Sequence, residues 1–202
     1  MRILHISDTH NKHRQVKNLP SADLIIHSGD VSFAGTEDEL INFIDWFRSL
    51  DYKYKIFIGG NHDFYLEETN RETIQSLLPN NCYYLDKSEI TIENINFFGL
   101  PFFVSESMSG DYEQSIKLIP KDTNILITHR PPYGILDYSG TINYGCQDLL
   151  KAISKIKPRY NLFGHIHDAY GVKETPHTTF ANTALVDEHY HLINKPFVFD
   201  YK

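Results

Sequence analysis

Short apolar runs alternate with polar, helix-like stretches along most of the chain. The runs are rich in β-branched and aromatic residues, and they occupy positions 3–6, 24–26, 54–58, 90–92, 95–98, 125–127, 162–163 and 197–199. Their near-continuous hydrophobicity predicts strands that are buried on both faces, as in a sheet covered by helices or by another sheet.

The clearest helical pattern covers residues 36–50. Thr36 has the side chain of an N-cap, and Glu39 follows three residues later, which together form the signature of a capping box. An apolar stripe at helical spacing follows, and it consists of Leu40, Phe43, Ile44, Phe47 and Leu50. This segment is therefore expected to pack one face of a helix against a sheet.

Two further helices are expected at residues 69–78, before Pro79, and at residues 147–156, before Pro158. The stretch from Phe102 to Pro120 reads instead as a long surface loop with one helical turn at most. Strands and helices that alternate early, followed by a strand-rich middle, predict a layered α/β fold.

Composition narrows the class of protein. A chain of 202 residues with 41% hydrophobic and 22% charged residues is expected to form one domain over residues 1–202. The net charge of −7 argues against a long nucleic-acid partner. No apolar run has the ~18 residues that a membrane span needs, and two isolated cysteines, Cys82 and Cys146, fit a reducing compartment. We therefore expect a cytoplasmic protein without a membrane partner.

Five apolar runs end directly in residues that can bind metal ions. Because the carboxyl ends of strands meet at one crevice in open α/β sheets, these groups are expected to converge there. Asp, His and Asn donors suit Zn, Mn or Fe. The segments are Asp8-Thr9-His10, Asp30, Asn61-His62-Asp63, His129 and His165-Ile166-His167.

Taken singly, each of these segments has an ordinary structural explanation. A pair such as His165 and His167 is more often part of a surface loop than a ligand set, and a dipeptide such as Gly29-Asp30 is common in turns. Their shared placement after five predicted strands is what favours a binding site over coincidence.

The pattern DxH, GD, GNH followed by Asp, a single His, and GHxH resembles that of the calcineurin-like metallophosphoesterases. The stretches THRPPYGILDY, GCQDLL, FGHIHDAYG and TTFANTA resemble the branch of metallophosphoesterase-domain-containing proteins, and the metal pattern is similar to that of class III cyclic nucleotide phosphodiesterases. This resemblance implies a four-layer α-β-β-α sandwich of two mixed sheets flanked by helices.

The resemblance also implies a site with two divalent ions, which would be Mn, Fe or Zn, with Mn favoured. The implied ligands of one ion are Asp8, His10, Asp30 and His167, and those of the other are Asp30, Asn61, His129 and His165. Asp30 would bridge the two ions. Animal members of the branch can carry glycine in place of the first His of GHxH, whereas this chain has His165 and is expected to retain both sites.

Three other residues are candidates for catalysis or for binding of the substrate. His62 resembles the family's catalytic histidine, which contacts a phosphate oxygen or protonates the leaving group, and Asp63 would orient its ring. Arg130 follows His129 and is a candidate clamp for the substrate phosphate, although a surface position is a comparable alternative.

The expected activity is hydrolysis of a small phosphodiester, with a cyclic nucleotide as the favoured example, through in-line attack by a hydroxide that bridges the two metal ions. A phosphomonoesterase or phosphoprotein phosphatase is the nearest alternative. A nuclease is disfavoured because the chain has no basic groove, and a scaffold without activity is disfavoured because all seven ligand positions and His62 are kept. The oligomeric state stays open.

Overall fold

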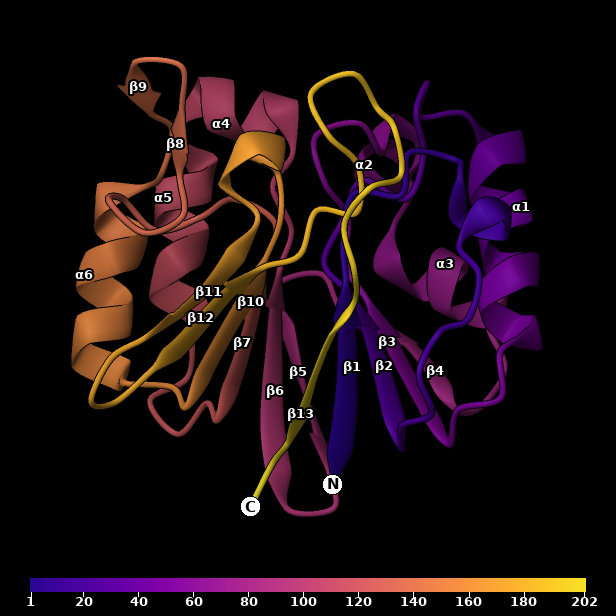
Figure 1. Ribbon diagram of the computed structural model, residues 1–202, viewed down its shortest axis with the longest axis horizontal. Coiled ribbons are helices and arrows are strands. Elements are labelled where there is room, and N and C mark those ends of the chain that lie inside the picture. The colour runs from indigo at the N-terminus through magenta and orange to yellow at the C-terminus, as the bar shows by residue number, and fades with distance from the viewer.

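The computed structural model describes residues 1–202 and shows two β-sheets packed face to face between two layers of helices (Figure 1). The first sheet has the strand order β13-β1-β2-β3-β4, in which only β13 runs antiparallel to its neighbour. Its strands are β1 (Arg2–Ile6), β2 (Leu24–His27), β3 (Tyr54–Phe57), β4 (Cys82–Tyr84) and β13 (Phe197–Asp200).

The second sheet has the order β11-β12-β10-β7-β6-β5 and is also mixed, because the two edge strands run antiparallel to their neighbours. Its strands are β5 (Ser88–Ile92), β6 (Ile95–Leu100), β7 (Ile125–Thr128), β10 (Tyr160–Phe163), β11 (Gly171–Glu174) and β12 (Thr179–Asn182). A small hairpin of β8 (Tyr138–Ser139) and β9 (Ile142–Asn143) stands apart. The predicted four-layer sandwich is therefore confirmed.

Helices cover the outer face of each sheet (Figure 1). On the first sheet lie α1 (Glu37–Ser49) and α3 (Arg71–Ser76), with α2 (Phe64–Glu68) near the loop end. On the second lie α4 (Val104–Ser109), α5 (Asp111–Ser115) and α6 (Gln147–Ile156). Three single 3₁₀ turns complete the chain, namely η1 (His13–Gln15), η2 (Ile116–Leu118) and η3 (His167–Ala169).

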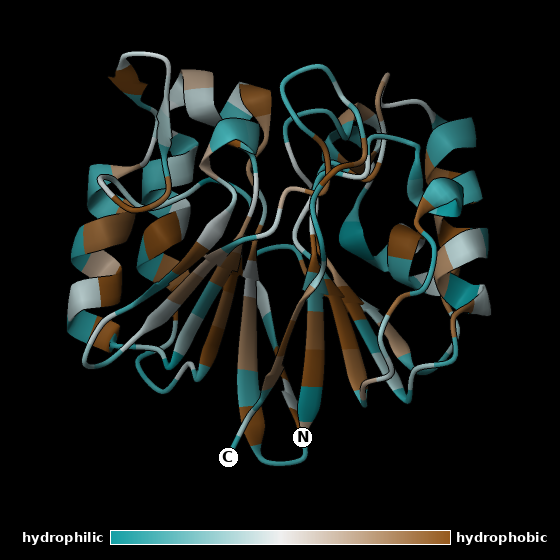
Figure 2. Cartoon of the chain, in the orientation of Figure 1, coloured by the Kyte–Doolittle hydropathy of each residue, from teal (hydrophilic) through white to brown (hydrophobic).

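The central strands are buried on both faces, as their sequence predicts, and Figure 2 shows hydrophobic colour along them. Successive side chains of a strand point to opposite faces. In β2, Leu24 and Ile26 pack between the two sheets, whereas Ile25 packs under α1 with Phe43. Alternation thus supplies both the core between the sheets and the core beneath the helices.

Helix α1 begins as predicted but departs from a complete capping box. The side chain of Thr36 accepts a hydrogen bond from the backbone N–H of Glu39 at 3.3 Å. The carboxylate of Glu39 does not return this bond to Thr36. Its Oε2 atom instead accepts from the backbone N–H groups of Phe33, Ala34 and Gly35, at 2.7–3.0 Å. Glu39 therefore organises the loop before the helix.

Two sequence expectations were wrong in detail. The helix expected over residues 69–78 is shorter, because Asn70 caps α3 by accepting from the N–H of Thr73 at 2.8 Å. The segment from Phe102 to Pro120 is not a surface loop: it forms α4, α5 and η2, and Tyr112 is fully buried in it. Its apolar residues cover the outer face of the second sheet. The polar stretch SESMSGD within this segment made it resemble a surface loop in the sequence.

The two sheets are joined at the carboxyl end of β1. The N–H of Ser7 donates to the carbonyl of Thr183 at 3.1 Å, and the N–H of Leu185 donates to the carbonyl of Ser7 at 3.0 Å. The segment after β12 thereby pairs with the segment after β1, which brings together loops from both sheets. None of the helices combines the length and the apolar content needed to cross a lipid bilayer.

Candidate metal centre

The predicted ligands lie in loops at the carboxyl ends of β1, β2, β3, β7 and β10, at the opposite end of the sheets from both chain termini (Figure 1). Four of them leave their strands in the left-handed region, with φ of 53° for Asp8, 41° for His10, 55° for Asp30 and 71° for His165. Residues with a Cβ seldom adopt such angles, and they cluster at functional sites where the surrounding structure holds them.

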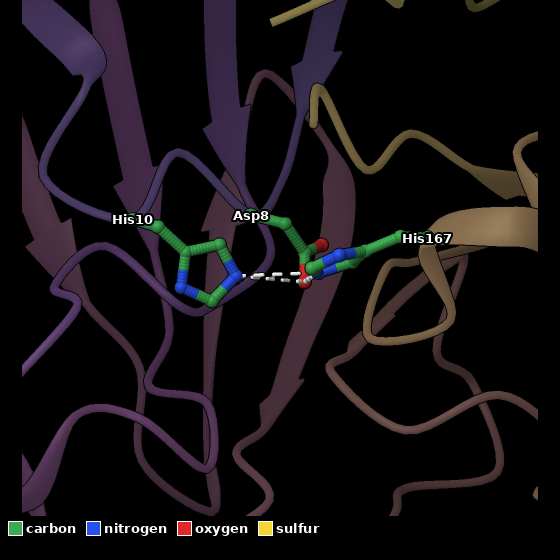
Figure 3. Close-up of side chains that lie close together, drawn as sticks. All are labelled: Asp8, His10 and His167. Atoms are coloured by element: carbon green, nitrogen blue, oxygen red, sulfur yellow. Dashed lines mark hydrogen bonds and ion pairs between the residues drawn. The ribbon is translucent and has the colours of Figure 1, made fainter. Parts of the chain in front are cut away.

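Asp8, His10 and His167 form one group (Figure 3). The Oδ1 atom of Asp8 lies 3.3 Å from Nε2 of His167 and 3.9 Å from Nε2 of His10. The two Nε2 atoms are 3.2 Å apart. One carboxylate and two imidazoles from the two sheets thus point at a common place.

Asp30, His129 and Asn61 form a neighbouring group. The Nε2 atom of His129 lies 3.3 Å from Oδ2 of Asp30 and 3.0 Å from Oδ1 of Asn61. The same Oδ2 atom of Asp30 is 3.6 Å from Nε2 of His10. Asp30 therefore faces both groups, which is the position that a bridging carboxylate requires.

His165 reaches the same place through different contacts. Its backbone N–H lies 3.1 Å from both carboxylate oxygens of Asp8, and its ring packs edge-on against those of His129 and Phe102, with centroids 5.1 and 5.3 Å away. It lies outside the three groups of His and Asp atoms that approach within 4.8 Å of one another. All seven predicted ligands are nonetheless brought together by the fold.

The chemistry of these contacts fits bound cations. The Nδ1 atoms of His167 and His129 lie 3.0 and 2.9 Å from the carbonyl oxygens of Asp187 and Ser28, and a carbonyl can only accept. If each ring is neutral, its proton is therefore on Nδ1 and its Nε2 is unprotonated. The unprotonated Nε2 of His167 then faces the carboxylate of Asp8, and that of His129 faces the amide oxygen of Asn61. Such contacts between acceptors are satisfied by a cation between them or by protonation of the ring.

Electrostatics keeps the two carboxylates ionised. Burial alone would raise the pKa of Asp8 and Asp30, but the neighbouring histidines hold both pKa values well below the usual range. Burial lowers the pKa of His10 to about 4 and that of His165 to about 3. Although burial opposes it, the charge of Asp30 raises the pKa of His129 to about 9. The centre thus combines fixed negative charge with the imidazole lone pairs of His10 and His165, whereas a cation at the centre would compete with the proton on His129.

Glycines make room for these side chains. A Cβ atom on Gly164 would overlap the carboxylate of Asp8, and one on Gly60 would overlap that of Asp30. The two carboxylates therefore occupy space that only a residue without a side chain leaves free.

His62 lies beside the centre with its ring held by the main chain. Its Nδ1 atom is 2.9 Å from the carbonyl oxygen of Phe33, and its ring contacts that of His10 edge-on with centroids 4.8 Å apart. The backbone N–H of His62 also donates a hydrogen bond to Oδ1 of Asp30 at 2.8 Å. The remaining ring nitrogen is the one free to act at the site.

Asp63 does not orient the ring of His62, contrary to the expectation from sequence. Its carboxylate accepts from the backbone N–H groups of Gly60, Val31 and Ser32 at 2.8, 3.2 and 2.9 Å, and from the hydroxyl of Ser32 at 2.5 Å. Asp63 is buried and ties the loop after β2 to the loop after β3. The carbonyl of Phe33, not the carboxylate of Asp63, accepts the hydrogen bond that orients the ring of His62.

Arg130 is likewise engaged with protein. Its Nε donates to the carbonyl of Tyr144 at 3.1 Å, and its guanidinium lies over the rings of Phe102 and Tyr112 at 5.2 and 5.9 Å from their centroids. One guanidinium nitrogen lies 4.0 Å from Glu113. These contacts hold the segment that follows β9, and no hydrogen bond or ion pair joins the Arg130 side chain to the seven predicted ligands.

Tyr190, an aromatic residue that the sequence did not single out, borders the centre. The ring of Tyr190 packs edge-on against His10 and His167, with centroids 4.8 and 5.4 Å away, and also against Phe33. Tyr190 lies in a loop that follows no predicted strand, with φ of 61°. Only its position between two histidines, His189 and His191, could have drawn attention to it.

The sequence matches a family model described as calcineurin-like phosphoesterase over residues 1–169. It is 35% identical to human metallophosphoesterase domain-containing protein 1 in an alignment of 231 positions, gaps included, which covers 98% of this chain and 70% of the human protein. It is also 34% identical to a UPF0046 protein of Caenorhabditis elegans, with 98% of this chain and 74% of that protein covered.

Solved structures share the fold at low sequence identity. One is 12% identical, with a TM-score of 0.66 over 100% of this chain and 99% of the other. Another, described as a novel archaeal phosphodiesterase, is 17% identical, with a TM-score of 0.51 over 98% of this chain and 100% of its own.

Proposed function

The chain belongs to the calcineurin-like phosphoesterase family, and on that premise we propose that it hydrolyses a small phosphodiester with the help of two divalent metal ions. A cyclic nucleotide is the favoured substrate and manganese the favoured metal. Members of this family act on phosphoesters, and the preference for a diester is our own inference.

One observation carries the proposal. The Oδ2 atom of Asp30 faces His10 on one side and His129 on the other, at 3.6 and 3.3 Å. We assign Asp8, His10, Asp30 and His167 to one ion and Asp30, Asn61, His129 and His165 to the other. Divalent ions held in this way would lower the pKa of a bound water and offset the charge of the phosphate in the transition state.

The chain's own residues complete the chemistry. Hydrolysis joins a water oxygen to phosphorus and breaks the ester P–O bond, so the departing alkoxide needs a proton. We assign that donation to His62, whose Nδ1–H is held by the carbonyl of Phe33, so that the other ring nitrogen can point at the leaving oxygen. Asn61 supplies a neutral oxygen, which limits the negative charge beside an anionic substrate.

A phosphomonoesterase is the alternative within the same family, since the metal centre alone does not distinguish one ester bond from two. A substrate panel with added manganese separates the two activities. It contains 2',3'-cyclic and 3',5'-cyclic nucleotides, bis(p-nitrophenyl) phosphate and p-nitrophenyl phosphate. We expect the diesters to be cleaved with the higher kcat/KM, and a clear preference for p-nitrophenyl phosphate would overturn the proposal.

A further inference from the structure

A cavity of about 310 Å³ opens directly beside the candidate metal centre. His165 and His167, two of the predicted ligands, form part of its wall. Its other sides come from the β8–β9 hairpin with the residues just after it, and from the loop of residues 187–191. A phosphate bound at the metal centre would therefore have its organic group next to this cavity.

Two aromatic rings line the cavity, and both stand on well-held backbone. The N–H of Tyr144 donates to the carbonyl of Asp137 at 2.9 Å, and its own carbonyl accepts from Arg130. The N–H of Tyr190 donates to the carbonyl of Asp187 at 2.9 Å, and its carbonyl accepts from the ammonium of Lys12. These bonds hold the backbone of both tyrosines, and the ring of Tyr190 also packs against His10 and His167. Tyrosine rings have only two side-chain torsions to order, so they offer apolar faces to a planar or sugar-like group at small entropic cost.

Two carboxylates share the same wall. Asp168 lies one residue after His167 and accepts a hydrogen bond from the hydroxyl of Ser139 at 2.5 Å. The carboxylate of Glu188 is exposed, and its one ion-pair contact is His189 at 3.4 Å. Carboxylates accept hydrogen bonds from hydroxyl and amino groups and repel anions. The cavity wall is therefore negatively charged, whereas a metal centre beside it would attract phosphate.

We propose that this cavity is the binding site for the nucleoside of a nucleotide diester, and that Asp168 and Glu188 exclude substrates with a second phosphate. The inference rests on the proposed function for the placement of the reacting phosphate at the metals. A volume near the lower end of ligand pockets, which begin at about 300 Å³, is of the size that one nucleoside occupies. Tyr144 and Tyr190 contact the base or sugar, and the carboxylates accept from its hydroxyl and amino groups.

Three chromogenic diesters with the same leaving group test the selectivity. They are thymidine 5'-(p-nitrophenyl phosphate), its 3'-phosphorylated analogue, and bis(p-nitrophenyl) phosphate, each assayed with manganese. We expect kcat/KM for the first to exceed that for the second by about tenfold, because the added phosphate meets two like charges. Glu188→Lys is expected to bring this ratio of kcat/KM values to about one or below. Glu174 is an exposed glutamate on β11, and Glu174→Lys should leave the ratio unchanged.

Binding of a nucleoside to the cavity is measured without catalysis, so that the test of the cavity does not depend on whether the protein hydrolyses diesters. Thymidine, which has no phosphate to be cleaved, is titrated against the full chain with manganese present, and binding is followed by isothermal titration calorimetry. We expect saturable binding that Tyr144→Ala weakens roughly 5- to 100-fold. Tyr138→Ala, an exposed tyrosine of the hairpin outside the cavity wall, serves as the matched control and should bind like the wild type.

The outcomes separate the two proposals. If bis(p-nitrophenyl) phosphate is not cleaved but thymidine binds in a Tyr144-dependent manner, the cavity assignment stands and the hydrolase proposal fails. If the diesters are cleaved but Glu188→Lys leaves the ratio unchanged and Tyr144→Ala binds thymidine like the control, the cavity assignment is overturned. Absence of thymidine binding to the wild-type chain overturns it as well.

Discussion

The Nε2 atoms of His10 and His167 lie 3.2 Å apart, although 157 positions separate these residues in the sequence. Both atoms face the carboxylate of Asp8, and the side chains of His10 and His167 are only 0% and 13% exposed. A divalent cation between these groups would bind the folded chain and not the unfolded one. We therefore expect metal binding and folding to be coupled at this site.

We expect manganese to raise the melting temperature of the chelator-treated protein. At a concentration about 100 times the Kd, ligand binding adds about 2.7 kcal/mol to the stability. For a chain of this size that corresponds to a shift of about 5–10 °C. Differential scanning calorimetry with and without manganese measures it. His167→Ala should lose most of the shift, and an equal shift in that variant would contradict the ligand assignment.

Asp30→Asn and His62→Gln should have different effects. Removal of the shared carboxylate is expected to weaken metal binding by more than about 100-fold, because even indirect partners of a ligand contribute 10- to 100-fold. His62→Gln should retain the metal and lose about 100- to 10,000-fold in kcat, as expected when a general acid is removed. Elemental analysis of the dialysed proteins and initial rates distinguish the two. Loss of metal from His62→Gln would show that His62 is a ligand.

Gly164→Ala should be far more damaging than an ordinary glycine replacement. The new Cβ would overlap the carboxylate of Asp8 and the side chain of Ser7, both of which are buried. We expect a loss of more than about 3 kcal/mol, together with loss of metal binding. Gly140→Ala is the control: its φ of 60° costs about 1–2 kcal/mol, but no atom lies near the added Cβ. Urea denaturation compares them, and equal losses would refute the crowding argument.

Glu39→Ala should impair catalysis from a distance. The carboxylate of Glu39 holds the N–H of Phe33, and the carbonyl of Phe33 holds the ring of His62. We expect a stability loss of about 1–2 kcal/mol, as for a lost cap, and a lower kcat with little change in KM. Glu39→Gln keeps an acceptor oxygen and should recover part of kcat. Asp38→Ala, in the same helical turn, should leave kcat unaltered, and a matching loss there would argue for a general effect of charge.

Apolar runs in the sequence predicted β1, β2, β3, β5, β6, β7, β10 and β13, and the residues after five of these runs predicted the candidate metal ligands, whereas β4, β8, β9, β11 and β12 were not predicted. Buried strands read as apolar runs because both of their faces are covered, and the residues that follow neighbouring strands of one sheet, such as Asp8 and Asp30, meet at one edge because those strands run parallel. These are local signals, so no knowledge of the partner segment was needed to recognise them.

The groups that support these residues became visible only in the folded chain. Tyr190 borders the site because the loop of residues 187–191 folds back over it, and Asp63 binds backbone N–H groups of three residues that no spacing rule connects to it. The folding of the segment from Phe102 to Pro120 into helices also depended on the sheet face beneath it. Contacts of this kind arise from packing between distant segments, which leaves no periodic trace in the order of the residues.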